Sequence, residues 1–197
     1  MSGVLYQYLS TDHDRLNDLL ERATAKSGLN DMECYGAFRK RLLRHISIEE
    51  KIVLPSIARW QGGKKAVQAD RLHLDHSAIV SLLVPPPNLS IISTLKSVFA
   101  AHNPLEESAA GLYDTFETLA GPETERMLEQ LKAAPAVPVL PHNPKPELLE
   151  LAKQALARAG MNLKKSEVRS VLTQRFTSML FHGRAMLGCC PLTPLGK

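Results

Sequence analysis

Four histidines and two glutamates occupy positions from which several predicted helices could bring them to one point. Between residues 5 and 120, each of four segments with helical periodicity carries one histidine on its apolar stripe. Two of these histidines are followed four residues later by a glutamate. The six residues are His13, His45, Glu49, His76, His102 and Glu106. Residues four apart on a helix are about 5–6 Å apart at Cβ, so each His-x-x-x-Glu pair presents an imidazole and a carboxylate side by side.

The simpler interpretation of any single histidine is a core or boundary residue with its own hydrogen-bond partner. The joint pattern is different, because six ionisable groups buried without a counter-ion would each cost several kcal/mol or become neutral. Bound cations would supply the missing charge. The pattern as a whole therefore favours a metal site.

The donor types indicate which metals could bind. Imidazole and carboxylate suit iron, manganese or zinc, and no thiolate lies near enough in the sequence to suggest an iron–sulfur or cysteine-bound zinc site. The donors exceed what one tetrahedral zinc needs, which favours two ions. Four imidazoles, two bridging carboxylates and one oxo or hydroxo bridge leave about two open positions on two six-coordinate ions. O2, peroxide, azide or NO could occupy these positions.

The elements that must position these residues are helices, because apolar side chains recur at spacings of three and four and period two is hard to find. Long helices are expected at about residues 9–23, 31–60, 64–84 and 89–119. Alternating spacings and short loops predict an all-α, up-down-up-down four-helix bundle. Counted from the loops, the ligands of neighbouring helices lie at similar depths. The third loop is the exception, with about 8 residues to His76 and about 13 to His102, which requires helix tilt or a different boundary.

Residues 5–120 resemble the hemerythrin-like, HHE cation-binding family of di-iron four-helix bundles. The segments that carry the resemblance are His45-x-x-x-Glu49-Glu50 followed by Leu54-Pro55, Asp75-His76-x-x-Ile79, His102-x-x-x-Glu106-Glu107, and His13 in an Asp-His context. The resemblance implies a non-haem di-iron centre, with His13 and His45 on one iron and His76 and His102 on the other. Glu49 and Glu106 would bridge, and manganese or zinc could substitute for iron.

Two departures from the family pattern leave alternatives open. Oxygen-carrying members use two histidines four apart on the third helix, whereas His73 and His76 are three apart. If His73 binds, one position stays open and reversible O2 binding is expected; if it turns outward, both irons are open and peroxide or NO chemistry is favoured. Pro104 predicts a kink in the fourth helix. Alternatively, Asn103 caps a restarted helix, Glu106 is no ligand, and Glu107 takes its place.

We therefore expect a protein that binds O2 or another small oxidant or radical for sensing, handling or stress protection. One alternative is a peroxide- or NO-reactive di-iron enzyme or an iron donor for cluster repair. Another is a metal-sensing bundle whose basic tail recruits a partner. Tyr6, Tyr35 and Tyr113 are expected in the core, although a tyrosine near two irons can also donate a hydrogen bond or act as a ligand.

Charge and composition organise the rest of the chain. Residues 1–142 hold 15 basic and 17 acidic side chains, and residues 143–197 hold 9 and 3, so nucleic acid is an unlikely partner of the bundle. We expect a bundle with a short helix over 1–132, a proline-rich linker over 133–146, and a basic helical hairpin and tail over 147–197, through which a homodimer could form. Three cysteines without a framework, no signal sequence and no membrane-spanning stretch favour a cytoplasmic protein.

Overall fold

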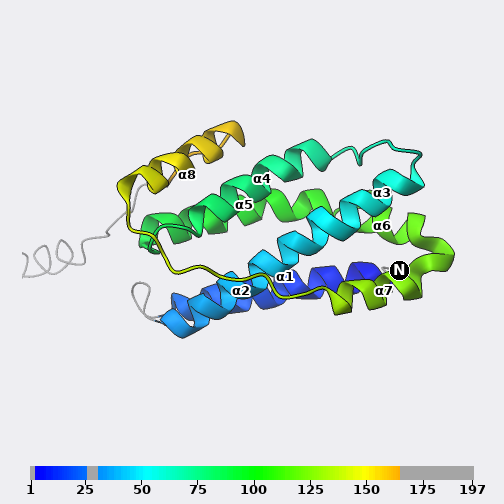
Figure 1. The fold of residues 1–197 in the computed structure, drawn as a ribbon, viewed down its shortest axis with the longest axis horizontal. Coiled ribbons are helices and arrows are strands. Elements are labelled where there is room, and N and C mark those ends of the chain that lie inside the picture. Colours follow the sequence, from blue (N-terminus) through cyan, green and yellow to red (C-terminus); the bar gives the residue numbers. More distant parts are fainter. Residues whose placement is uncertain (1–2, 26–30, 165–197) are drawn as a thin grey trace, which may run out of the picture. The chain divides into compact units, whose positions relative to one another are not determined.

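The computed structural model describes residues 3–25 and 31–164, which contain helices and no strand (Figure 1). The predicted all-α class is thereby confirmed. The described elements are α1 (Val4–Ala23), α2 (Met32–Ile48), the π-helical turn η1 (Glu49–Val53), α3 (Leu54–Trp60), α4 (Ala69–Leu82), α5 (Leu89–Glu107), α6 (Leu112–Ala120), the 3-10 turn η2 (Gly121–Glu123), α7 (Thr124–Ala133) and α8 (Pro146–Arg158). None of these helices is long and apolar enough to cross a membrane.

Contacts divide the chain into two units, Met1–Ser166 and Glu167–Lys197. The second unit lies outside the described residues, and so does the predicted second helix of the C-terminal hairpin. In the first unit, long helical runs lie side by side (Figure 1). These runs are α1, α2 continued by η1 and α3, α4, and α5. Helix α1 packs against α2 and α6, and α4 packs against α5.

A layer of buried polar side chains separates two apolar cores. One core includes Leu20 and Phe38, and the other includes Leu5 and Phe116. Each long run passes from one core to the other and carries buried polar residues where it crosses. These residues are Asp12, His13, His45, Glu49, Asp75, His76, His102 and Glu106. The apolar stripes therefore fix the depth at which the polar residues of all four runs meet.

The π-helical turn η1 widens the second run within this layer. Pro55 has no N–H, and in an α-helix its ring would clash with the carbonyl of Lys51, four residues earlier. The Leu54 N–H instead bonds the carbonyl of Glu49, five residues back, which is the bond that defines a π-helix. The widened turn begins with two carboxylates, Glu49 and Glu50.

The predicted fourth helix is interrupted. Helix α5 continues through Pro104 without restarting at Asn103 and ends at Glu107. A turn over residues 108–111 follows, in which Ala110 has a φ of 60°. A Cβ on Gly111 would lie 2.6 Å from the carbonyl oxygen of Glu106, so this turn has no room for a side chain there. Helix α4 also differs from expectation, because it begins at Ala69 rather than near residue 64.

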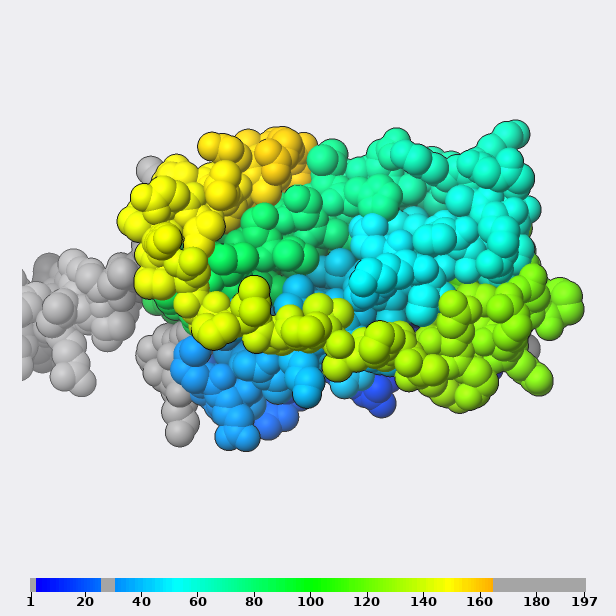
Figure 2. Space-filling model, in the orientation of Figure 1, coloured from blue at the N-terminus to red at the C-terminus, as the bar shows by residue number. Residues whose placement is uncertain are grey.

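An extended strap, residues 134–145, crosses the outer face of α2 and leads to α8 (Figures 1 and 2). Its prolines prevent helix formation. The Arg44 guanidinium donates to the carbonyl of Ala134 at 3.0 Å, and that of Arg39 donates to the carbonyl of Leu140 at 3.1 Å. Helix α8 then packs against α4.

Candidate metal centre

The polar layer brings the six candidate ligands together in two clusters. The first cluster is His13, His45, Glu49 and Glu106, and the second cluster is Glu49, His76, His102 and Glu106. In each cluster, one potential ligand atom per residue lies within 4.8 Å of all the others, and every member is buried. Glu49 and Glu106 belong to both clusters, so their carboxylates are placed to bridge two ions.

The donor atoms of the first cluster lie close together. The Nε2 atoms of His13 and His45 are 2.9 Å apart. His45 Nε2 lies 3.1 Å from Glu49 Oε1, and His13 Nε2 lies 3.4 Å from Glu106 Oε2. Adjacent ligands of a single metal ion have separations of this size.

The second cluster uses the other oxygen of each glutamate. His76 Nε2 is 3.2 Å from Glu49 Oε2, and His102 Nε2 is 3.2 Å from Glu106 Oε1. His76 Nε2, Glu49 Oε2 and Glu106 Oε1 are buried and have no hydrogen bond of acceptable geometry. An unsatisfied buried polar group costs about 1–3 kcal/mol, so three such atoms facing one another fit a cation better than they fit each other.

A carboxylate contacts the Nδ1 atom of every clustered histidine, on the side of the ring that faces away from the cluster. The Nδ1 contacts are His13 with Glu107, His45 with Asp12 at 3.1 Å, His76 with Glu50 at 2.6 Å, and His102 with Asp75 at 3.4 Å. With its proton on Nδ1, a neutral imidazole turns the lone pair of Nε2 inward, as a metal ligand requires. All four histidines are thus oriented for metal binding.

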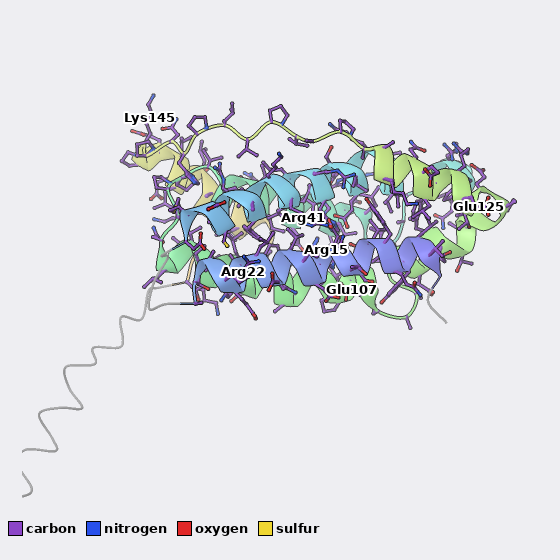
Figure 3. All side chains as sticks on the ribbon, turned by 90° about the horizontal axis from the view of Figure 1, so that it is seen from below. Arg15, Arg22, Arg41, Glu107, Glu125 and Lys145 are labelled. Carbon is purple, nitrogen blue, oxygen red and sulfur yellow. The ribbon has the colours of Figure 1, made fainter. Side chains whose placement is uncertain are left out.

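Two arginines support these outer carboxylates. Arg41, on α2, forms an ion pair with Asp12 of α1, and lies near the middle of the molecule in Figure 3. Arg71 Nε donates to Asp75 Oδ2 at 3.1 Å. Each aspartate precedes a clustered histidine in the sequence but contacts the histidine of the neighbouring helix. The outer contacts therefore connect α1 with α2 and α4 with α5.

Electrostatics shows how the layer is balanced without a metal. Burial alone would lower the pKa of His45, but Glu49 and Asp12 raise it to about 10. Burial would also lower the pKa of His102, but the Glu106 and Asp75 carboxylates raise it to about 9. Burial would raise the pKa of Glu49, but His45 and His76 hold it well below its usual range. Protons on the imidazoles therefore compensate the buried carboxylates until a cation replaces them.

Tyr113 of α6 reaches the centre of the first cluster. Its ring is fully buried, and its hydroxyl oxygen lies 2.5 Å from Glu49 Oε1 and 3.2 Å from Glu106 Oε2. The same oxygen is 3.0 Å from His13 Nε2 and 3.2 Å from His45 Nε2. Burial and the two carboxylates raise the pKa of Tyr113 well above 10. In the metal-free protein this phenol is therefore neutral.

His73 lies apart from both clusters. Its side chain is 44% exposed, and its Nδ1 contacts Glu50 at 2.7 Å. Glu107, the alternative to Glu106, contacts His13 from outside the first cluster, whereas Glu106 is fully buried within both clusters. The alternative in which Asn103 restarts the helix and removes Glu106 from the site does not match this arrangement.

Sequence reasoning missed the outer carboxylates and left Tyr113 among several tyrosines. The signal for the carboxylates was present: His13 and His76 each follow an aspartate, and Glu49 and Glu106 each precede a second glutamate. For Tyr113 no comparable signal exists, because a turn of irregular conformation sets its position relative to Glu106.

A small cavity adjoins the first cluster. Its volume, counted as the space open to the centres of water molecules, is about 10 Å³. This is room for about one water or diatomic molecule. Three residues of the first cluster, His13, His45 and Glu49, line the cavity together with His102 of the second cluster. Apolar side chains such as Ile79 and Phe99 complete the lining. Tyr113 does not line it.

A surface groove between α1 and α5 leads toward this cavity. The groove and the cavity share the side chains of Asn17, Phe99 and Asn103. Figure 3 shows α1 and α5 side by side along this face. A small molecule could therefore reach the first cluster by displacing a few side chains.

Comparison with known proteins identifies the family. The family model of the hemerythrin HHE cation-binding domain matches residues 4–121, which is more than half of the chain, and the chain belongs to this family. No curated protein and no solved structure gave a match.

Proposed function

We propose that this hemerythrin-family chain is an up-down-up-down bundle that holds two iron ions, one per cluster, and binds O2 or another small oxidant or radical. The observation that carries the proposal is the set of unsatisfied buried atoms in the second cluster, His76 Nε2, Glu49 Oε2 and Glu106 Oε1. His76 Nε2 lies 3.2 Å from Glu49 Oε2 and 3.7 Å from Glu106 Oε1, and Glu106 Oε1 lies 3.2 Å from His102 Nε2. The outer carboxylates already occupy the Nδ1 atoms of both histidines.

The donor set favours iron among the candidate metals. Imidazole and carboxylate together suit iron, manganese and zinc. The four donor atoms of each cluster would complete a tetrahedral zinc ion, whereas a six-coordinate iron would keep open positions for the small ligand proposed here. Iron supplies a Lewis acid that changes oxidation state and coordinates small ligands. Glu49 and Glu106 each direct one oxygen to the first cluster and the other oxygen to the second. The two carboxylates would therefore hold the two ions at a fixed separation.

The protein around the cavity selects for small, weakly polar ligands. The cavity admits about one diatomic molecule, and Ile79 and Phe99 exclude bulk water from it. The groove shared through Asn17 and Asn103 provides access. These features support binding and handling of a gas or small oxidant over turnover of a large substrate.

One observation favours a second candidate, a peroxide- or NO-reactive enzyme. His73 is exposed and held by Glu50, so the second cluster has only its four donors among the described residues. An ion there would keep more than one position for exogenous ligands. Steady-state consumption of peroxide or NO that His45→Ala abolishes would favour this candidate over a carrier or sensor.

Metal analysis of matched histidine variants tests the proposed function. After reconstitution with ferrous iron, the wild type and His73→Ala should each hold about two irons per chain, and His76→Ala should hold about one or fewer. Azide should change the visible spectrum of the oxidised wild type. A wild type that takes up no iron, or equal iron content in His76→Ala and wild type, would contradict the proposal.

A further inference from the structure

We propose that the phenolic oxygen of Tyr113 is a fifth ligand of the ion held by the first cluster. The inference rests on the proposed function, because it requires a metal there. It adds a donor from α6, outside the four histidine-bearing helices. It also makes the two ions of the centre chemically different.

The geometry of the first cluster carries the inference. Around an octahedral ion with bonds of about 2.1 Å, adjacent donors lie about 3.0 Å apart and opposite donors about 4.2 Å. The Tyr113 oxygen lies 2.5–3.2 Å from the clustered atoms of His13, His45, Glu49 and Glu106. It is therefore adjacent to all four donors, as an axial ligand above a square of four would be.

The four donors complete this square. His13 and His45 are adjacent at 2.9 Å, His45 and Glu49 at 3.1 Å, and His13 and Glu106 at 3.4 Å. All four fall within 4.8 Å of one another, which includes the distance expected for opposite donors. The remaining octahedral position lies opposite Tyr113. The cavity is lined by three of the donors but not by Tyr113, which places this position toward the cavity.

Hydrogen bonds alone would not satisfy the Tyr113 oxygen once the histidines bind a metal. A phenol has one proton to donate, and the short contact to Glu49 uses it. A metal displaces the protons that the imidazoles carry in the metal-free protein, so His13 and His45 then present lone pairs at Nε2, as Glu106 does at Oε2. The phenol oxygen would then face three further acceptors at 3.0–3.2 Å. A cation among them removes this repulsion, and the phenolic proton leaves to solvent as the oxygen binds the metal.

The fold holds Tyr113 in this place. The turn over residues 108–111 brings α6 back against α1, and Gly111 approaches the backbone of Glu106 so closely that no side chain fits. The Tyr113 ring is fully buried and meets the ring of Tyr6 edge to face, with centroids 6.0 Å apart. The hydroxyl therefore needs no rearrangement to reach a metal.

Visible and resonance Raman spectroscopy of the full-length, iron-loaded, oxidised protein tests the inference. Phenolate bound to ferric iron gives a visible charge-transfer band, and excitation into that band enhances tyrosine ring vibrations. We expect both in the wild type. Tyr113→Phe should lose at least nine-tenths of the band while keeping about two irons per chain.

Tyr35→Phe is the matched control. Tyr35 is also fully buried, and its hydroxyl has no hydrogen-bond partner and lies in the core that contains Phe38. Its loss should leave the band unchanged. The wild-type Raman spectrum decides the matter even if Tyr113→Phe fails to fold. Two irons without tyrosine vibrations, or a band that survives in Tyr113→Phe, overturns the inference but leaves the proposed function standing; absence of bound iron overturns both.

Discussion

The first and second clusters contain the same residue types, yet they are not equivalent. Each combines two histidines with one oxygen from Glu49 and one from Glu106. The first cluster has a phenol oxygen in contact with all four of its donors, whereas the second has three buried atoms without hydrogen bonds. A repeated pattern of Asp-His and His-x-x-x-Glu-Glu therefore builds two similar halves, and a residue outside the repeat distinguishes them.

The difference arises just beyond the repeats. Seven residues after Glu106 the chain has Tyr113, and seven residues after Glu49 it has Ser56. A serine side chain is too short to reach across a helix interface as tyrosine does. The comparison teaches that the protein supplies one more polar atom to the first half of the centre than to the second.

Removal of a shared carboxylate should abolish metal binding at both clusters. Glu106→Ala withdraws one donor from each cluster and leaves imidazoles without their buried counter-charge. We expect the iron content to fall from about two per chain to well below one, as measured by elemental analysis. Glu129→Ala, an exposed change on α7, is the control. Retention of two irons in Glu106→Ala would show that Glu106 is not a bridge.

The protons released on metal binding should distinguish the first cluster from the second. At pH 7 the metal-free protein holds protons on His45, with a pKa of about 10, and on His102, with a pKa of about 9. A metal displaces them, so its affinity should rise about tenfold per pH unit for each displaced proton until the pH reaches these values. An indicator dye in weak buffer measures the release. Tyr113→Phe should release about one proton fewer; equal release in both proteins would contradict phenolate binding.

The outer carboxylates offer a matched pair of changes, one for each half. Asp12→Asn weakens the orientation of His45 in the first cluster, and Asp75→Asn weakens that of His102 in the second. Loss of such a contact costs about 10–100-fold in metal affinity. Competition with a chelator should therefore show one weakened ion of the two in either variant. Equal weakening of both ions would mean that the halves are coupled.

The smallest effect is expected from Gly111→Ala. The new methyl group would press on the backbone of Glu106 and shift α6, at a cost of about 1–3 kcal/mol in the free energy of unfolding. The visible band assigned to Tyr113 should shift or weaken while two irons remain bound. Denaturant unfolding and the absorption spectrum measure the two effects. Gly36→Ala is the control, because no atom lies within 4 Å of an added Cβ there. It should leave the band unchanged and, as a change in the interior of α2, raise the free energy of unfolding by about 0.5–1 kcal/mol.

The sequence predicted which residues gather in the two clusters because helical periodicity is regular. His13, His45, His76 and His102 interrupt apolar stripes, so their direction follows from the residues on either side. The direction of His73 does not follow in this way, since a three-residue spacing allows one histidine to face inward and the other outward. Its contact with Glu50 depends on the neighbouring helix.

The features that sequence reasoning did not predict depend on irregular backbone. The π-helical turn depends on how one chain accommodates the missing N–H of Pro55. The turn over residues 108–111 breaks the helical phase, so the spacing from Glu106 to Tyr113 no longer tells which way the tyrosine points. The depth mismatch at the third loop is real: α4 ends at Leu82, six residues after His76, and α5 begins at Leu89, thirteen before His102.

The way the strap is attached over α2 determines which amino-acid substitutions it can tolerate. Arg39 and Arg44 grip it by main-chain carbonyl oxygens, which every amino acid possesses. Substitutions along the strap can therefore accumulate without loss of these two attachments, as long as the backbone stays extended. The two arginines are fixed points in such drift, as is the Val84 carbonyl that accepts from the Asn143 N–H at 3.0 Å. The His142 ring, which stacks on Tyr35, is a side-chain contact that a substitution in the strap would remove.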